Sequence, residues 1–190
     1  MQETEKMICE YKPGDHIIYG STGVCCVESI ITPDSKDAKH GFDKTRCYYV
    51  LKPLYHTETI YTPTDNTRVF MRPVISKEEA ERLIDLIPTI QAEAYHADSI
   101  QDLRNHYKAV TESYDCSDLI ELTMSIYAKK QYAEQQKRKF GEVDGKFMKQ
   151  AEEMLFGEFS VALGIDRNAV QEYISERVMK KAQKGPCKNT

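Results

Sequence analysis

Apolar and polar positions alternate with a period close to two in the first part of the chain, which predicts β-strands. The clearest stretch runs from Lys12 to Ile31, KPGDHIIYGSTGVCCVESII. Pro13 and Gly14 offer the fixed φ and the positive φ that a tight turn requires, and Gly20 to Gly23 forms a second, polar break. Most residues on either side of that break are β-branched or aromatic. We therefore predict a β-hairpin here.

Three further strands are predicted after a loop over Thr32 to Lys44, which is rich in Pro, Asp, Ser and Gly. They run from Arg46 to Leu54, from Thr57 to Thr64, and, after a turn, from Thr67 to Met71. Short strands joined by tight turns, with no helical pattern among them, are typical of a small SH3-like or Tudor-like β-barrel. We predict such a barrel for residues 1–75, behind a polar lead-in over residues 1–10.

The hydrophobic period changes to about 3.6 residues at Ser76, which predicts helices for the rest of the chain. Ser76 with Glu79 fits a capping box. The predicted helices are one capped by Ser76 and ended by Pro88, one that starts at Ser99, one from about Ser117 to Phe140, one capped by Asp144 and ended by Gly164, and one capped by Asp166, before a loose tail from Gly185. Four or five amphipathic helices with short connections form a bundle. The predicted fold class is α+β with two domains, a barrel over 1–75 and an all-α bundle over 76–190.

Composition places the chain among ordinary globular proteins. Hydrophobic residues make up 41%, charged residues 29%, and mean hydropathy is -0.58, so the chain is neither disorder-like nor membrane-like. No apolar run approaches the roughly 20 residues needed to cross a bilayer, and the polar start MQETEKM is unlike a signal peptide. We therefore expect a cytoplasmic protein.

The charge is distributed unevenly. The net charge of -4 argues against non-specific binding of nucleic acid by the whole molecule. Seven basic residues between 129 and 149 nevertheless outnumber three acidic ones, namely Lys129, Lys130, Lys137, Arg138, Lys139, Lys146 and Lys149. This stretch could meet phosphates, because the start of the next helix adds a partial positive charge. The alternative is a solvated helix end, with lysines placed there by the helix dipole.

Motifs for catalysis or for a cofactor are missing from the sequence. There is no Walker motif, G-x-G-x-x-G, H-E-x-x-H or G-x-S-x-G. The six cysteines form no C-x-x-C pair, so we expect buried free thiols, and the five histidines are scattered. We predict no enzyme, cofactor or metal site. A metal or redox enzyme built from dispersed Cys and His residues is the remaining alternative in that class.

Tyrosine is the main aromatic residue, with twelve copies and no tryptophan. Tyr48 and Tyr49 are neighbours in a predicted strand, so one should face into the barrel and the other outward. An outward tyrosine beside Arg46, Tyr61 and Arg68 would suit a protein interface, where Tyr and Arg are enriched. Ordinary barrel packing with one exposed ring is the alternative interpretation.

Several segments together resemble the CarD/CdnL family of bacterial transcription regulators. The first is the hairpin, with Gly-Asp-x-hydrophobic-hydrophobic-Tyr over Gly14 to Tyr19, then Gly-Val and Val-Glu-x-Ile. In the helical half the likeness continues with Arg104 to Lys108, RNHYK, and with Ala151 to Phe159, AEEMLFGEF. The resemblance covers about residues 11–165 in the family's order.

This resemblance implies a function. Proteins of the family hold the β subunit of bacterial RNA polymerase with the N-terminal barrel and touch promoter DNA at the upstream edge of the melted bubble with the helical domain, so that the open complex lasts longer. The implied polymerase-binding residues are Arg46, Tyr48, Tyr49, Tyr61, Pro63 and Arg68. The implied DNA-binding residues are Leu103, Arg104, Lys130, Lys137, Arg138, Lys139, Lys146 and Lys149. The resemblance implies neither a membrane partner nor a small-molecule substrate.

Two positions depart from the family pattern. Leu103 stands where relatives commonly place a tryptophan that wedges at the minor groove, and Tyr61 stands where they often place an arginine for the polymerase contact. Leucine can also wedge between base steps, although its stacking surface is smaller, or it can face the core. The alternative function is a protein-interaction adaptor whose barrel binds a different partner and whose bundle does not bind DNA.

Overall fold

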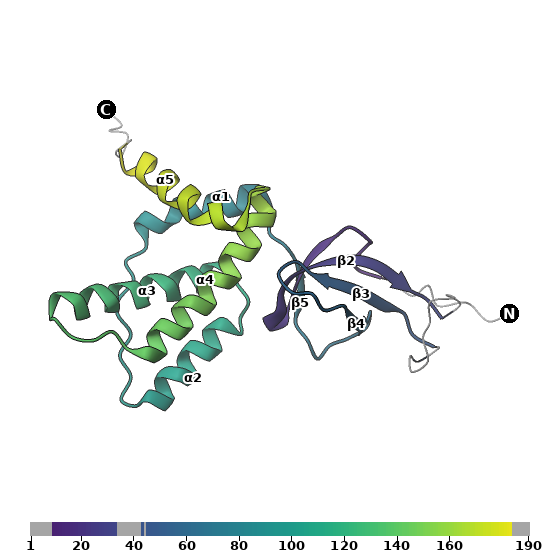
Figure 1. Ribbon diagram of the computed structural model, residues 1–190, viewed down its shortest axis with the longest axis horizontal. Helices are drawn as coiled ribbons and strands as arrows, with labels where there is room; N and C mark the ends of the chain where they lie inside the picture. The colour runs from purple at the N-terminus through teal and green to yellow at the C-terminus, as the bar shows by residue number, and fades with distance from the viewer. Residues whose placement is uncertain (1–8, 34–42, 44, 184–190) are drawn as a thin grey trace. The chain divides into compact units, whose positions relative to one another are not determined.

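The computed structural model describes residues 9–33, 43 and 45–183 (Figure 1). Most of the predicted lead-in, most of the predicted loop between the second and third strands, and the predicted tail lie outside the described residues. The chain divides into two compact units, Met1–Val74 and Ile75–Thr190. Each unit has a hydrophobic core of its own.

The first unit is built on one antiparallel sheet of five strands with the order β4-β3-β2-β1-β5. Its strands are β1 (His16–Tyr19), β2 (Gly23–Ile31), β3 (Tyr48–Pro53), β4 (Ile60–Pro63) and β5 (Met71–Pro73). The predicted hairpin is confirmed as β1 and β2. Because β4 and β5 form the two edges of the sheet, strand pairing among the described residues does not show the predicted closure into a barrel.

The fifth strand was predicted too early in the chain. The backbone N–H of Arg68 donates to the side-chain oxygen of Asn66 at 2.9 Å, which folds this stretch into a turn. Pairing with β1 starts only at Met71, which lies opposite Tyr19. A polar side chain that bonds its own backbone therefore delays the strand.

Glycines at positive φ make the hairpin's turns possible. Gly14 has φ 95° and donates its N–H to the carbonyl of Val27 at 2.8 Å, so the chain enters β1 already bonded to β2. A one-turn 3-10 helix, η1 (Gly20–Thr22), then joins the two strands, and Gly23 leaves it with φ 81°. Side chains with a β-carbon are strained at both angles.

The core of the sheet lies on the face that carries Tyr49. Its buried residues come from β1, β2 and β3 together with Tyr11 ahead of the sheet, namely Tyr11, Ile17, Cys25, Val27, Tyr49 and Leu51. The Tyr11 N–H donates to the Tyr49 hydroxyl at 3.1 Å, which satisfies the polar end of a side chain that has no solvent exposure. This bond links the segment that precedes β1 to strand β3.

The second unit is all helical. Its helices are α1 (Lys77–Leu86), η2 (Ile87–Thr89), α2 (Ile100–Thr111), α3 (Cys116–Gln135), α4 (Glu142–Leu163), η3 (Arg167–Ala169) and α5 (Val170–Gln183). The caps predicted at Ser76, Ser99 and Asp166 are confirmed, since each side chain accepts a backbone N–H of the next turn. Gly164 ends α4 in the left-handed conformation, as predicted.

Two predictions for the helices were wrong. α3 ends at Gln135 rather than Phe140, because the chain turns at Lys137, which has φ 53°. α4 starts at Glu142 with Gly141 at the N-cap, so Asp144 lies inside the first turn and is not the cap. Its carboxylate is occupied elsewhere, as described below.

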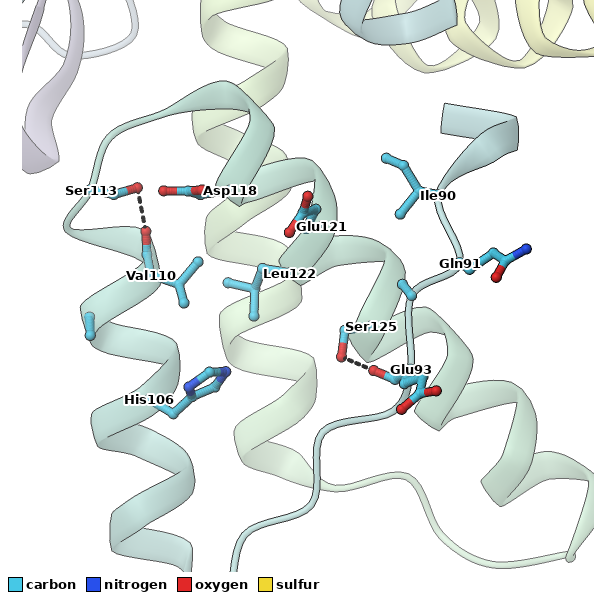
Figure 2. Close-up of a pocket in the computed structure, with 12 residues that line it drawn as sticks. Ile90, Gln91, Glu93, His106, Val110, Ser113, Asp118, Glu121, Leu122 and Ser125 are labelled. Atoms are coloured by element: carbon cyan, nitrogen blue, oxygen red, sulfur yellow. Dashed lines mark hydrogen bonds between the residues drawn. The ribbon is translucent and has the colours of Figure 1, made fainter. Parts of the chain in front are cut away.

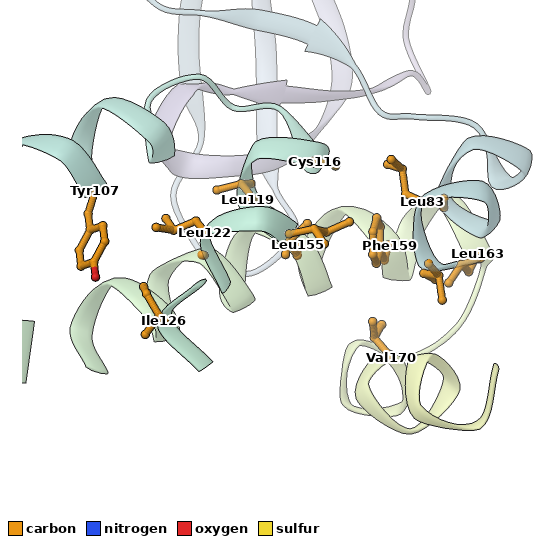
Figure 3. Close-up of a cluster of buried hydrophobic side chains, with 14 of the residues drawn as sticks. Leu83, Tyr107, Cys116, Leu119, Leu122, Ile126, Leu155, Phe159, Leu163 and Val170 are labelled. Atoms are coloured by element: carbon orange, nitrogen blue, oxygen red, sulfur yellow. The ribbon is translucent and has the colours of Figure 1, made fainter. Parts of the chain in front are cut away.

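The core of the helical unit runs along the contact of α3 and α4 and continues to α1 and α5 (Figure 3). Fully enclosed side chains from four different helices meet there, among them Ile84, Leu119, Phe159 and Val170. Burying one such side chain stabilises the fold by roughly 1.5 to 3 kcal/mol. The helices therefore form a single packed body around α4.

Three further observations concern the part of the chain that the structure describes. None of its helices is long and apolar enough to cross a membrane. No group of three or more His, Cys, Asp or Glu side chains is placed to hold a metal ion within residues 9–33, 43 and 45–183. Cys25, Cys47 and Cys116 are buried thiols outside any disulfide, as predicted, whereas Cys9 and Cys26 are only half-buried. Cys187 lies outside these residues.

Candidate functional site

Three of the residues predicted to bind polymerase share one face of the β3–β4 pair. In the register of this antiparallel pair, Tyr48 lies opposite Pro63 and Val50 lies opposite Tyr61. Directly opposed residues project to the same side of a sheet, and so do alternate residues of one strand. We call the surface formed by Tyr48, Val50, Tyr61 and Pro63 the β3–β4 face. It includes two residues of the edge strand β4, where Tyr61 is 38% exposed.

Tyr49 projects to the opposite side of β3 and is a correction to the predicted site. Its side chain is fully enclosed among the core residues of the sheet. Burial raises the pKa of its phenol, and the N–H bond from Tyr11 opposes that effect. Of the two neighbouring tyrosines, Tyr49 is therefore a core residue and only Tyr48 belongs to the surface, as the alternation of a strand requires.

The two arginines that were predicted to bind polymerase differ in their position relative to the β3–β4 face. Arg46, two residues before β3, donates from Nε to Asp65 Oδ1 at 3.1 Å, and Asp65 follows two residues after β4. This bond raises the pKa of Arg46 and lowers that of Asp65. Arg68 is exposed in the turn between β4 and β5. The sheet thus holds Arg46 at one end of the β3–β4 face, and Arg68 belongs to the neighbouring turn.

The predicted DNA-binding cations gather where α3 passes into α4. Lys137, Arg138 and Lys139 form the connection between the helices, and Lys146 lies in the second turn of α4. All four side chains are exposed, and no ion pair among the described residues engages them. We call these four residues the basic segment. Lys149 extends it along α4 but lies 3.8 Å from Glu153.

Lys129 does not add to this positive surface. Its ammonium lies 2.8 Å from Asp144 Oδ1, and the two side chains are 18% and 6% exposed. The Tyr107 hydroxyl donates to the same carboxylate oxygen at 2.8 Å. Burial raises the pKa of the Tyr107 phenol, and the hydrogen bond to Asp144 raises it further. The three residues join α2, α3 and α4 through one buried polar cluster.

Leu103, Arg104 and Lys130 have separate environments. Leu103 is 9% exposed and lies in the core of the helical unit, so it is a packing residue and not an exposed wedge. This corrects the prediction made from its place in the sequence. Arg104 is exposed on α2, with no described hydrogen bond to the basic segment. Lys130 is half-buried on α3 and opposes the rise in the pKa of Glu152 that burial causes.

Sequence reasoning missed the role of Asp144, although the sequence contained a signal. Asp144 stands on the same helical stripe as Phe147, Ala151 and Leu155, at intervals of three or four residues. A carboxylate on an apolar stripe must find partners inside the protein, because an isolated buried charge is costly. The identity of those partners, Lys129 and Tyr107, comes from packing between helices and has no local signature.

Comparison with known proteins identifies the first unit. The family model described as the CarD-like/TRCF RID domain matches residues 11–75. This stretch contains all five strands and the whole β3–β4 face. The N-terminal unit is therefore a CarD-like/TRCF RNA-polymerase-interacting domain, and the chain has an RNA-polymerase-interacting role related to transcription. Domains of this kind are protein-interaction domains. No curated protein matches the chain.

Proposed function

We propose that this protein is a bacterial transcription regulator that acts in the cytoplasm on initiating RNA polymerase. In this proposal the β3–β4 face binds the polymerase β subunit, and the basic segment contacts promoter DNA. The helical unit then stabilises the open complex by holding DNA near the melted region. The match of residues 11–75 to a polymerase-interacting domain is the observation that carries the proposal.

The surface of the matched domain supports a protein partner. The β3–β4 face combines two tyrosines with a proline and a valine, and Arg46 stands at its end. Rigid aromatic side chains and arginine are the residue types that contribute most to binding energy at interfaces. Val50 is only 6% exposed, so the rings of Tyr48 and Tyr61 provide the contact area while the valine supports them.

The basic segment supports a weak DNA contact that depends on polymerase. Exposed cations without ion pairs can replace counterions on phosphates, and the N-terminus of α4 adds backbone N–H groups beside them. A protein with a net charge of -4 binds DNA poorly by itself. Once the first unit is attached to polymerase, a high effective concentration lets this weak contact operate.

The test of the polymerase contact is binding of the full chain to a purified lobe of the β subunit. Tyr61→Ala should weaken binding by about tenfold, the effect expected for an interface tyrosine. Tyr132→Ala is the matched control, because Tyr132 is equally a surface tyrosine but lies on α3. Equal affinity of the Tyr61 variant and the wild type would contradict the proposed face.

Arg46 requires a design that separates binding from local structure. Arg46→Asp alone removes both a possible polymerase contact and the ion pair with Asp65. Adding Asp65→Arg restores an ion pair of reversed polarity. If Arg46 contacts polymerase directly, the double variant still binds weakly; if its role is to hold the ends of β3 and β4, the double variant regains affinity.

One observation favours the adaptor alternative. Leu103 is enclosed in the core and the chain has no tryptophan, so neither supplies an exposed DNA wedge of the kind the resemblance implied. An adaptor would bind its partner through the β3–β4 face and leave the lifetime of open complexes unchanged. Measuring that lifetime with purified polymerase and promoter DNA distinguishes the two functions, because only the regulator prolongs it.

A further inference from the structure

A groove runs along the helical unit on the side where α2 and α3 meet the segment that follows η2 (Figure 2). Its volume is about 760 Å³, within the range of protein ligand sites. The segment from Ile90 to Glu93 forms one wall, and α2 and α3 form the rest. The Ser125 hydroxyl donates to the carbonyl of Glu93 at 2.7 Å, which fastens this wall to α3. The groove is therefore defined by packed helices and a bonded segment.

Three carboxylates rim the groove, those of Glu93, Asp118 and Glu121. Each side chain belongs to an exposed residue, and none of the three forms an ion pair with any part of the chain that the structure describes. Elsewhere in the helical unit many exposed carboxylates are paired, as Glu79 is with Arg82. The rim thus carries negative charge that no described ion pair neutralises, and Figure 2 shows Glu93 on the segment after η2 and Glu121 on α3.

The floor between these carboxylates is apolar. Val110 and Leu122 lie there, Ile90 adds an apolar side chain from the wall, and Ala109 lines the groove on the α2 side with a small side chain. His106 forms the end of the groove and stacks on Tyr95, with ring centroids 3.8 Å apart. A ligand that fills the groove would therefore bury aliphatic groups on the floor and place cations at the rim.

We propose that this groove binds a peptide segment of a protein partner, in which arginine or lysine side chains flank aliphatic ones. Charge complementarity selects this occupant: cations pair with the rim, and the aliphatic side chains remove the floor from water. DNA is disfavoured, because its phosphates would face the three carboxylates. The contact is independent of the polymerase and DNA contacts proposed above, since it uses none of their residues.

The test uses the full chain and a synthetic peptide of alternating leucine and arginine with one tryptophan. The chain contains no tryptophan, so the indole emission reports the peptide alone. Neutralising the rim with Glu93→Gln, Asp118→Asn and Glu121→Gln should weaken binding by about tenfold, as expected for several solvent-exposed ion pairs. Ala109→Phe, which fills the floor from an exposed helix position, should weaken it comparably.

A charge-matched variant shows whether the effect is local. Glu58→Gln, Glu134→Gln and Glu172→Gln remove the same charge from exposed positions outside the groove and should leave the affinity within about twofold of the wild type. Three results would overturn the proposal: equal weakening by this variant, unchanged binding by the Ala109 variant, or equal binding of a peptide with glutamate in place of arginine.

Discussion

Lys129 Nζ lies 2.8 Å from Asp144 Oδ1, and this ion pair joins α3 to α4 almost out of reach of water. The Tyr107 hydroxyl completes the cluster from α2. A buried pair of this kind contributes little net stability compared with apolar packing, but leaving one charge without its partner is costly. The cluster therefore fixes how three helices meet.

Removal of the cation is expected to destabilise the protein strongly. Lys129→Met keeps the length of the side chain but leaves the Asp144 carboxylate buried without a cation, and should lower the free energy of unfolding by about 3 kcal/mol. Adding Asp144→Asn should restore part of this loss, because the amide oxygen still accepts from Tyr107 and carries no charge. Urea denaturation followed by circular dichroism measures the free energy of unfolding of the single and the double variant. A double variant less stable than Lys129→Met alone would contradict this account.

Two glycines near the start of α4 should differ in their response to the same substitution, because only one of them is close to a buried carboxylate. A β-carbon on Gly141 would collide with Asp144 Oδ2, so Gly141→Ala should displace that carboxylate and cost about 2 kcal/mol. A β-carbon on Gly145 would meet Phe140 at an ordinary 3.5 Å. Since alanine is preferred inside a helix, Gly145→Ala should be neutral or stabilise by up to about 1 kcal/mol. Thermal unfolding of both variants compares them directly.

Stability should depend on pH through the contact of α1 with α5. Arg177 donates to both carboxylate oxygens of Asp85, from Nε at 2.6 Å and from Nη2 at 3.2 Å. This contact holds the pKa of Asp85 below its usual value. Because the folded pKa lies below the unfolded one, the stabilisation is complete above about pH 4 and is lost as the pH falls through the folded pKa.

Arg177→Gln should therefore cost about 1 kcal/mol near pH 7, and the difference from the wild type should shrink below about pH 4. Chemical denaturation at several pH values measures this difference. Arg104→Gln is the control, because Arg104 is exposed and forms no ion pair within the described residues. Its stability difference from the wild type should stay small at every pH. A constant penalty for the Arg177 variant down to pH 2 would argue against the role of Asp85.

The proposed DNA contact predicts a specific loss on charge reversal. Lys137→Glu, Arg138→Glu and Lys146→Glu together should shorten the lifetime of open complexes formed with purified polymerase. They should also reduce the salt dependence of promoter binding by about 0.9 in slope for each phosphate contact removed. Binding to the isolated β-subunit lobe should not change, because these residues belong to the helical unit.

The matched control for that experiment reverses three exposed lysines elsewhere, Lys12, Lys77 and Lys180. The net charge changes by the same amount in both variants, so a general repulsion from DNA would affect them equally. A loss confined to the first variant supports the basic segment. Equal losses would show that only the overall charge of the protein matters.

Local patterns in the sequence predicted most elements of the fold. The turn at Gly14, the helix caps at Ser76 and Ser99 and the end of α4 at Gly164 all follow from the conformational preferences of single residues. Such preferences act within a few positions along the chain and are therefore visible in the sequence. The polymerase-interacting domain was likewise predicted from residues of the first hairpin, and the family comparison supports it.

What the sequence did not predict depends on contacts between distant residues. Asp144 has the residue type and position of a cap, but Lys129 and Tyr107 hold its side chain inside the bundle. Leu103 matched a functional position by alignment, and the packing of the helical unit places it in the core. In each case the three-dimensional neighbours, rather than the local pattern, decide which way the side chain points.

Each unit contains a buried thiol whose reactivity reports on the opening of that unit. Cys25 is fully enclosed in the sheet, where burial raises its pKa to about 12. Cys116 is 2% exposed in the helical unit, and its thiol donates to Glu158 Oε2 at 3.1 Å. Thiol reagents attack the accessible thiolate, so neither cysteine reacts until its surroundings open. The rate at which a reagent labels Cys25 would therefore measure the opening of the polymerase-interacting domain. The rate for Cys116 would measure the opening of the helical unit independently, within the same molecule.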